Sequence, residues 1–192
     1  MHPLLNNIKS SITYGKKPEN LKIYEFTKII NPEFITVGNN VIIDDFCLLY
    51  AKEDALIEIG SWVHIASFTS LTGGPIKIGN FCTIASGSRI IAGSDHYKNG
   101  ALMNSTIPDK YRALNRQGCI MEDCSFLSAN CMLFPGVTVG EGAVAGAGSI
   151  IRKDLEPWGI YIMRNGKMEK IKDRDKEKTI QNTIKLKNEL NL

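Results

Sequence analysis

The chain has 192 residues, of which 43% are hydrophobic and 22% charged, and its formal net charge is +3. This length and composition fit one soluble globular domain, and the small net charge argues against a nucleic-acid partner. No apolar run approaches the roughly 20 residues of a membrane span, and the first residues lack the pattern of a signal peptide. The five cysteines are an odd number, which suits free thiols in a reducing compartment. We therefore expect a cytoplasmic protein.

The N-terminal residues differ in pattern from the rest of the chain. Residues 2–12 place Leu4, Leu5, Ile8 and Ile12 at helical spacing, before the Gly15–Pro18 stretch breaks the pattern. Residues 21–36 are apolar but follow no regular period. We expect a short N-terminal helix and a lead-in, together covering residues 1–36.

From Val37 onward a bulky aliphatic residue returns every six positions within groups of three, and extra residues stand between the groups, before Ile59 and before Ile78. Four positions after most of these anchors stands a small or short residue, such as Cys47, Cys82 or Cys131. A period of six fits a short strand followed by a corner, so that three units close one triangular turn. The anchors are Val37, Ile43, Leu49, Ile59, Ile65, Leu71, Ile78, Ile84, Ile90, Met121, Leu127, Leu133, Val139, Ala145 and Ile151. They predict a parallel β-helix of about five turns over residues 37–154.

Aromatic residues recur at the corners of the predicted turns. The register places Phe46 with Phe68 in one corner column and Trp62 with Phe81 in another. These side chains are expected to stack between turns. In one interpretation the N-terminal segment covers these rings, or they merely fill corners. In the other they belong to a subunit interface, because large apolar outer faces are rare on monomers. Flat-sided prisms suit packing around a threefold axis.

The repeat stops between Ile90 and Met121, where a long polar loop covers about residues 93–118 and contains His96. Loops longer than about 12–15 residues are uncommon unless they are functional. We expect this loop to contact the substrate.

Beyond Ile151, Pro157 and Gly159 are expected to end the β-helix, which leaves residues 155–192 as a basic C-terminal segment. Ile180, Ile184 and Leu190 lie on roughly one helical face. This pattern predicts a C-terminal helix, which we expect to cap the last turn because an open prism end exposes unpaired strand edges.

The run LFPGVTVGEGAVAGAGSIIRKDLEPWGIY, residues 133–161, resembles the terminal repeats of hexapeptide-repeat acyltransferases. The segments GSDHY, TIPDKY and EPWGIY are similar to acetyltransferases that modify sugars for bacterial surface polysaccharides. The resemblance implies an all-β fold, a left-handed parallel β-helix, and a homotrimer. It also implies acetyl-CoA as co-substrate, bound between neighbouring prisms, and a sugar or nucleotide sugar as acceptor.

The resemblance points to His96, at the head of the long loop, as the catalytic base. An acceptor hydroxyl or amine must lose a proton as it attacks the thioester, and an imidazole with a pKa near 6.5 can take that proton at neutral pH. His64 is the alternative base, because it lies between inward-pointing Val63 and Ile65 and should face outward. Either histidine could instead be a solvated residue or a subunit contact.

For CoA, the resemblance implies backbone contacts at the corners near Ser128 and Ala147, and cations Arg152 and Lys153 near the phosphates. The two cations could equally be a solvated pair. The family usually continues with G-x-P-A-K, whereas this chain reads YIMRNGKMEK. Gly166 and Lys167 are candidate replacements for that turn, and the form of the adenine pocket stays open.

Two other functions remain open at this point. A carbonic-anhydrase-like zinc site needs about three histidine ligands, for which only His64 and His96 are candidates, so we expect no metal. A non-catalytic β-helix scaffold is the other alternative, which the altered YIMRNGK segment favours and the histidine-bearing loop disfavours.

Overall fold

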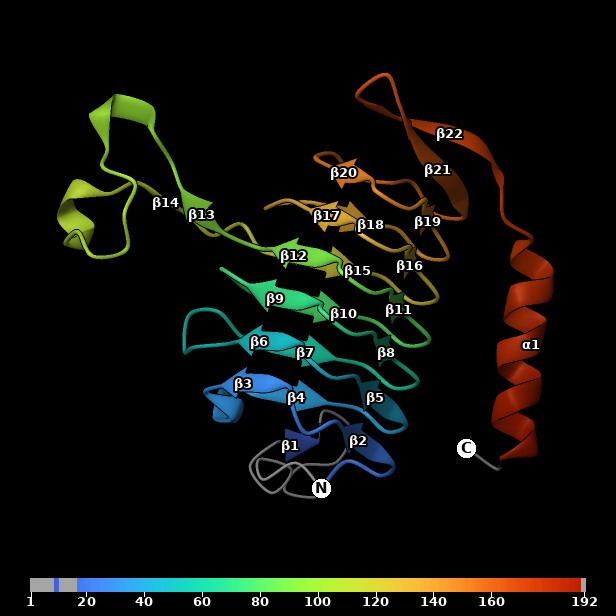
Figure 1. Cartoon of the computed structure of the whole chain (residues 1–192). Coiled ribbons are helices and arrows are strands. Elements are labelled where there is room, and N and C mark those ends of the chain that lie inside the picture. Colours follow the sequence, from blue (N-terminus) through green and yellow to red (C-terminus); the bar gives the residue numbers. More distant parts are fainter. Residues whose placement is uncertain (1–8, 11–16, 191–192) are drawn as a thin grey trace.

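The computed structural model describes residues 9–10 and 17–190. These residues form a three-sided prism of about seven stacked turns, with an arm projecting from one edge and a helix running along another (Figure 1). The predicted parallel β-helix is confirmed. Most of the predicted N-terminal helix lies outside the described residues, and the described part of that range, Lys9–Ser10, is strand β1.

Three sheets form the sides of the prism, and successive strands visit them in turn. Sheet A contains β1, β4 (Ile35–Val37), β7 (Ile57–Ile59), β10 (Ile76–Ile78), β15 (Cys119–Met121) and β18 (Thr138–Val139). Sheet B contains β2 (Leu21–Ile23), β5 (Val41–Ile43), β8 (His64–Ile65), β11 (Thr83–Ile84), β16 (Phe126–Leu127), β19 (Val144–Ala145), β21 (Gly159–Arg164) and β22 (Lys167–Asp173). Sheet C contains β3 (Lys28–Ile30), β6 (Leu48–Tyr50), β9 (Ser70–Thr72), β12 (Arg89–Ile91), β17 (Met132–Leu133) and β20 (Ile150–Ile151). We name the edges between them AB, BC and CA.

The predicted register is confirmed. Every anchor from Val37 to Ile151 is at most 2% exposed, and neighbouring turns pair anchor to anchor, as Ile59, Ile78 and Met121 do in sheet A. Burying each of the larger aliphatic anchors contributes about 1.5–3 kcal/mol. The core is therefore a column of aliphatic side chains inside the prism.

The prediction of about five turns is too low because the spacing changes at both ends of the repeat. Ile23 and Ile29 are buried anchors of an earlier turn, separated from Val37 by the 3₁₀ turn η2 (Pro32–Phe34). At the other end Leu155 bridges to Val139 and Tyr161 pairs with Ala145. The β-helix therefore continues through Pro157 and Gly159, which were expected to end it.

Side chains at edge AB connect one turn to the next. The side-chain oxygen of Asn80 accepts a hydrogen bond from the backbone N–H of Ser61 at 2.9 Å, and Asp123 accepts one from the N–H of Asn80 at 2.7 Å. Asn39 and Ser61 make equivalent bonds in the turns below. These side chains satisfy corner N–H groups that the ladders cannot reach.

The C-terminal segment forms a hairpin and a helix. Asn165 and Gly166 have φ angles of 49° and 74°, as a two-residue hairpin turn requires, and they join β21 to the antiparallel β22. Helix α1 (Lys176–Glu189) starts at Asp175, whose carboxylate accepts from the N–H of Lys178. The predicted helix is confirmed, but β22 covers the last strand of sheet B, and α1 runs beside the stack rather than capping it (Figure 1).

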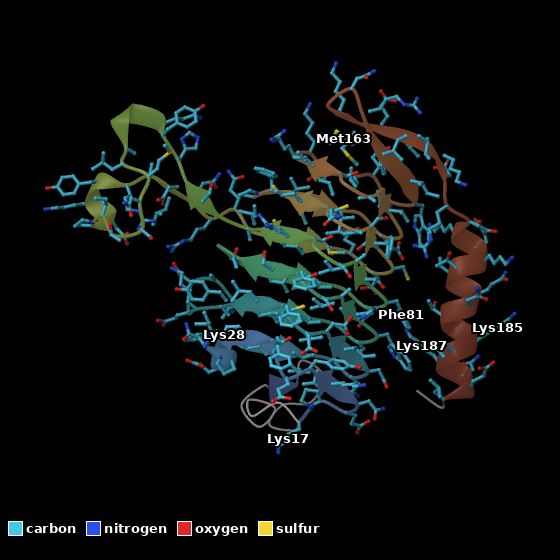
Figure 2. All side chains as sticks on the ribbon, in the orientation of Figure 1. Lys17, Lys28, Phe81, Met163, Lys185 and Lys187 are labelled. Atoms are coloured by element: carbon cyan, nitrogen blue, oxygen red, sulfur yellow. The ribbon has the colours of Figure 1, made fainter. Side chains whose placement is uncertain are left out.

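Helix α1 lies along edge AB. The Arg174 guanidinium donates to the carbonyls of Cys124 and Gly142, and the Lys187 ammonium lies 5.5 Å from the centre of the Phe81 ring. Figure 2 shows Phe81 and Lys187 between the prism and the helix. The predicted stack of Trp62 on Phe81 is present, with ring centres 6.2 Å apart.

All five cysteines are free and buried. Burial raises the pKa of Cys47 and Cys82 to about 11 and that of Cys119 to about 12. The Cys82 thiol donates to the carbonyl of Glu122 at 3.1 Å, and the Cys119 thiol to that of Phe134 at 3.2 Å. These thiols pack the core and are poor nucleophiles.

We expect the stability of the protein to fall in alkaline solution. Thiols of an unfolded chain ionise near pH 8.5, whereas these buried thiols stay protonated to higher pH. The unfolded state therefore releases protons first, and each such thiol lowers the free energy of unfolding by about 1.4 kcal/mol per pH unit above about pH 9. Urea unfolding between pH 7 and 10 measures this slope. The variant Cys47→Ala/Cys82→Ala/Cys119→Ala should have a flatter profile, and an unchanged slope would contradict the assignment.

Candidate functional site

The arm, residues 94–115, leaves the prism at edge CA between β12 and β15. Its two ends are the antiparallel strands β13 (Ser94–Asp95) and β14 (Leu114–Asn115), and its body contains the 3₁₀ turns η3 (Lys98–Gly100) and η4 (Asp109–Tyr111). The long loop predicted at about residues 93–118 is thus confirmed, and Figure 1 shows it standing away from the prism. Ile78 and Met121 pair directly across the insertion, so the arm does not disturb the register.

His96 lies at the base of the arm, directly after β13. Its backbone N–H donates to the carbonyl of Ala113 at 2.7 Å, and its ring stacks on Tyr97 with centres 5.0 Å apart. The Nδ1 atom accepts a hydrogen bond from the backbone N–H of Lys98 at 3.0 Å. Because Nδ1 accepts this bond, the hydrogen of the neutral ring lies on Nε2. The lone pair that can take a proton is therefore on Nδ1, where it already accepts from the N–H of Lys98.

Two charged residues that the sequence analysis did not single out, Asp95 and Arg112, hold the arm at its base. Arg112 is 12% exposed and forms a 2.6 Å ion pair with Asp95, which is 16% exposed, and a 3.0 Å pair with Asp109. The Asp95 carboxylate raises the pKa of the Arg112 guanidinium above its ordinary value. Among the described residues, Nε of Arg112 is buried without a hydrogen-bond partner. Asp95 adjoins His96 in the sequence, and that adjacency was the available signal.

A hollow of about 500 Å³ lies beside this ion pair, between the arm and the prism. Tyr50, Lys52 and Arg116 line its prism side, and Ser105, Asp95, Asp109 and Arg112 line its arm side. Lys52 and Arg116 both pair with Asp54, and the hydrogen bond from Lys52 holds the pKa of that carboxyl below its usual range. The walls combine donors and acceptors, as a polyhydroxylated ligand requires.

His64 lies elsewhere, on the outer face of sheet B, where it pairs with Ile42 and Thr83 of the neighbouring strands. Its Nε2 atom is 3.0 Å from Oδ2 of Asp44, and its side chain is 46% exposed. A carboxylate at Nε2 favours the tautomer with hydrogen on that atom, which leaves Nδ1 free to accept a proton. Within one chain, the two candidate histidines do not share a site.

The predicted phosphate-binding cations come together at the top of edge CA. Arg152, Lys153 and Lys167 line one hollow of about 450 Å³, together with Tyr161 and Met168. The Arg152 guanidinium lies 4.8 Å from the centre of the Phe134 ring, which holds it in place. All three cations are exposed, and no carboxylate of the described residues forms an ion pair with them.

Ser128 and Ala147 occupy the opposite edge of sheet C, edge BC. The Ser128 N–H donates to the carbonyl of Ala145, and in the next turn the Gly148 N–H donates to that of Ala129. The corner is built from small residues, so a thin ligand can approach its backbone. One chain therefore does not bring the two predicted groups of CoA contacts together, because they lie on different edges.

Among residues 9–10 and 17–190, no helix is both long and apolar enough to cross a bilayer. No cluster of three or more His, Cys, Asp or Glu side chains in that part of the chain is arranged to hold a metal ion.

Comparison with known proteins gives several similar chains, although no family model matches. The structure of AntD, an N-acyltransferase from Bacillus cereus, in complex with dTDP and 3-hydroxybutyryl-CoA is 35% identical with a TM-score of 0.83, covering 91% of this chain and 90% of that one. A point variant of AntD in complex with dTDP-4-amino-4,6-dideoxyglucose and coenzyme A has a TM-score of 0.80 at 35% identity, covering 89% of each chain.

A curated relative from Escherichia coli is a dTDP-4-amino-4,6-dideoxy-D-glucose acyltransferase. It is 29% identical over 145 residues, which are 75% of this chain and 75% of that protein. A hexapeptide-repeat-containing acetyltransferase from Vibrio cholerae has a TM-score of 0.52 at 15% identity, covering 83% of this chain and 76% of that one, and shares the fold alone.

Proposed function

The chain belongs to the hexapeptide-repeat acyltransferases that use acyl-CoA, and we propose that it acylates the amino group of a dTDP-linked 4-amino-4,6-dideoxy sugar. The likeness to AntD with dTDP and an acyl-CoA bound, over about nine-tenths of both chains, carries this proposal. The sequence left open whether oxygen or nitrogen receives the group, and this likeness favours nitrogen.

In the proposed reaction the sugar amine attacks the thioester carbonyl directly. A C–N bond forms, the C–S bond breaks, the amine loses a proton, and CoA leaves as a thiol. We assign the base to His96 at Nδ1, where the amine would replace the N–H of Lys98 as the donor. The hollow beside the arm would receive the sugar, and the Arg112 guanidinium, which lines this hollow, would donate to one of the sugar's oxygen atoms.

The predicted CoA contacts support a homotrimer with sites between subunits. Arg152, Lys153 and Lys167 lie at edge CA, whereas Ser128 and Ala147 lie at edge BC. One CoA molecule would meet both groups when edge CA of one protomer faces edge BC of the next. Such contacts between two different patches close into rings, and a threefold ring gives three equivalent sites.

The test of this function is a product assay with purified protein. Incubation with acetyl-CoA and dTDP-4-amino-4,6-dideoxyglucose should give an N-acetylated nucleotide sugar by mass spectrometry, while dTDP-glucose, which lacks the amine, should not react. Acetylation of dTDP-glucose would overturn the choice of nitrogen. Absence of both transfer and saturable acetyl-CoA binding would favour the non-catalytic scaffold.

Neutralising the cations of edge CA should weaken acetyl-CoA binding. We expect Arg152→Gln/Lys153→Gln to raise the KM for acetyl-CoA about tenfold, because exposed ion pairs contribute up to about 1 kcal/mol each, with little change in kcat. Adding Lys167→Gln should raise it further. Lys172→Gln, on the exposed face of β22, is the matched control, and an unchanged KM in the triple variant would refute the assignment.

A further inference from the structure

Edge AB carries a hollow of about 580 Å³ between the prism and the C-terminal end of α1, which we call the AB hollow. Figure 2 labels one residue on each of its two sides, Phe81 on the prism and Lys187 on the helix. The lining residues that matter below are Asn39, Asn40, Trp62 and Phe81 of the prism and Lys187 and Leu190 at the end of the helix. None of the residues that we assign to acyl transfer or to CoA lines this hollow.

The helix that forms the outer wall is not packed into a core. No side chain of α1 is buried, and Ile184 and Leu190, which were predicted to share an apolar face, are 52% and 47% exposed. A helix that packs on its own domain normally buries an apolar stripe. Helix α1 and edge AB therefore enclose space that the side chains of the described residues do not fill.

Two aromatic residues occupy strained corners beside this space. Trp62 and Phe81 lie at equivalent corners of successive turns and have φ angles of 61° and 57°, a region that bulky residues avoid and that Gly and Asn tolerate. The corresponding corners of other turns have Asn40 and Gly142, with φ angles of 57° and 65°. Strain of this kind clusters at functional sites, which indicates that the two rings do more than fill corners.

The stack that these rings form is incomplete on the side of the hollow. On edge BC the predicted stack of Phe46 on Phe68 is confirmed, and Phe26 extends it by one more turn. On edge AB the stack ends at Trp62, because the next corner has Asn40, whose amide covers less of a ring than an aromatic side chain would. Part of the Trp62 ring therefore borders the hollow, where the ring of a ligand can continue the stack.

Polar groups lie next to this ring. Oδ1 of Asn39 accepts from the N–H of Glu19, and Oδ1 of Asn40 accepts from Nδ2 of Asn20, both at 2.9 Å. No described residue accepts from Nδ2 of Asn39 or of Asn40, so two donors are available beside Trp62. Among the described residues, Glu19 and Lys187 are the charged side chains of the lining, and their charges cancel. This chemistry fits a ligand with a flat apolar face, hydroxyl groups at its rim and no net charge.

We propose that the AB hollow is a non-catalytic binding site for a neutral oligosaccharide. The C–H face of one pyranose ring lies on Trp62, its oxygen atoms accept from Nδ2 of Asn39 and Asn40, and a hydroxyl donates to the Glu19 carboxylate. Edge AB is separate from edges CA and BC, to which we assign the reaction. The site therefore holds the enzyme on a glycan without taking part in acyl transfer, and its existence does not depend on the proposed function.

Tryptophan fluorescence tests the site directly. The chain has two tryptophans, and Trp158 is 7% exposed. Trp158→Phe leaves Trp62 as the single reporter, and Phe suits the backbone because Phe81 has a similar φ at the equivalent corner. The probes are maltotetraose, cellotetraose and chitotetraose, each added up to about 20 mM so that millimolar Kd values are measurable. The comparison probe is dTDP.

We expect at least one tetrasaccharide to change the Trp62 emission saturably, and calorimetry with the wild-type protein to give a matching Kd. Trp62→Asn should weaken binding of that tetrasaccharide about tenfold or more, and Asn suits this backbone, as Asn40 shows. The matched control is Phe68→Asn, which removes a ring from a corner with a φ of 63° on edge BC and should bind as the wild type does.

Three results would overturn the proposal. One is that none of the tetrasaccharides binds saturably, and another is that Trp62→Asn binds as tightly as the wild type. The third is that dTDP changes the Trp62 emission while the tetrasaccharides do not, because the hollow would then be a nucleotide site. Binding is measured without acyl-CoA, so none of these results bears on acyl transfer, and loss of acyl transfer does not bear on the AB hollow.

Discussion

Replacing His96 by Ala is expected to lower kcat/KM about 10²- to 10⁴-fold, the usual contribution of a general base. The melting temperature should stay unchanged, because His96 lies in the arm and contributes nothing to the aliphatic column of the prism. Initial rates with acetyl-CoA and the dTDP amino sugar, together with thermal unfolding, measure both effects. The loss corresponds to about 3–5 kcal/mol of activation free energy.

The chemical role of His96 is resolved by a second substitution. Asn at this position keeps an N–H donor but cannot take a proton at neutral pH, so His96→Asn should be as impaired as His96→Ala. A nearly active His96→Asn enzyme would mean that the ring acts as a hydrogen-bond donor, as the Nε2 hydrogen allows. His64→Ala is the companion variant. If it abolishes activity while His96→Ala is active, the base is His64 and its partner is Asp44.

Replacing Arg112 by Ala is expected to lower kcat about 10²-fold, because the arm loses the connection between Asp95 and Asp109 and a misplacement of about 1 Å can have that effect. The KM for acetyl-CoA should not change, since Arg152 and Lys153 lie in a different hollow. Steady-state kinetics with each substrate varied in turn separates the two constants.

The control for Arg112 lies in the same arm. Thr106→Ala removes an exposed hydrogen bond to Asn104 and should leave kcat within about twofold, since such surface changes cost little. Circular dichroism and thermal unfolding should be the same for both variants because the prism is untouched. A wild-type kcat in Arg112→Ala would show that the ion pair does not position the arm for the reaction.

The core of the fold is predictable from sequence because its period is regular. Aliphatic anchors six residues apart, in groups between Val37 and Ile151, predict the interior and the strand pairing. Prediction failed at the two ends, from Ile29 to Val37 and from Ile151 to Leu155, where the spacing changes and too few regular repeats lie beyond the change to reveal the outer turns. The same pattern fits either hand of coiling, and only the resemblance suggested the left-handed one.

The site was harder to predict because its contacts join distant parts of the chain. The resemblance suggested His96 and the three cations, which stay predictions, whereas the partners Asp95 and Arg112 meet only when β13 and β14 pair. Nothing local in the sequence distinguishes Arg112 from the other charges of the loop. The hairpin at Asn165–Gly166 did carry a local signal, since Asn-Gly between alternating apolar residues is typical of a two-residue turn.

The position of the arm at a corner has a consequence for how such enzymes diversify. Ile78 and Met121 pair as if the arm were absent, so the length and composition of the arm can vary without altering the strand pairing of the prism. Recombination that exchanges residues 94–115 between related genes would then transfer, as one unit, the segment that we propose contacts the acceptor. The prism, with the residues that we propose bind acyl-CoA, would stay the same in the recombined protein.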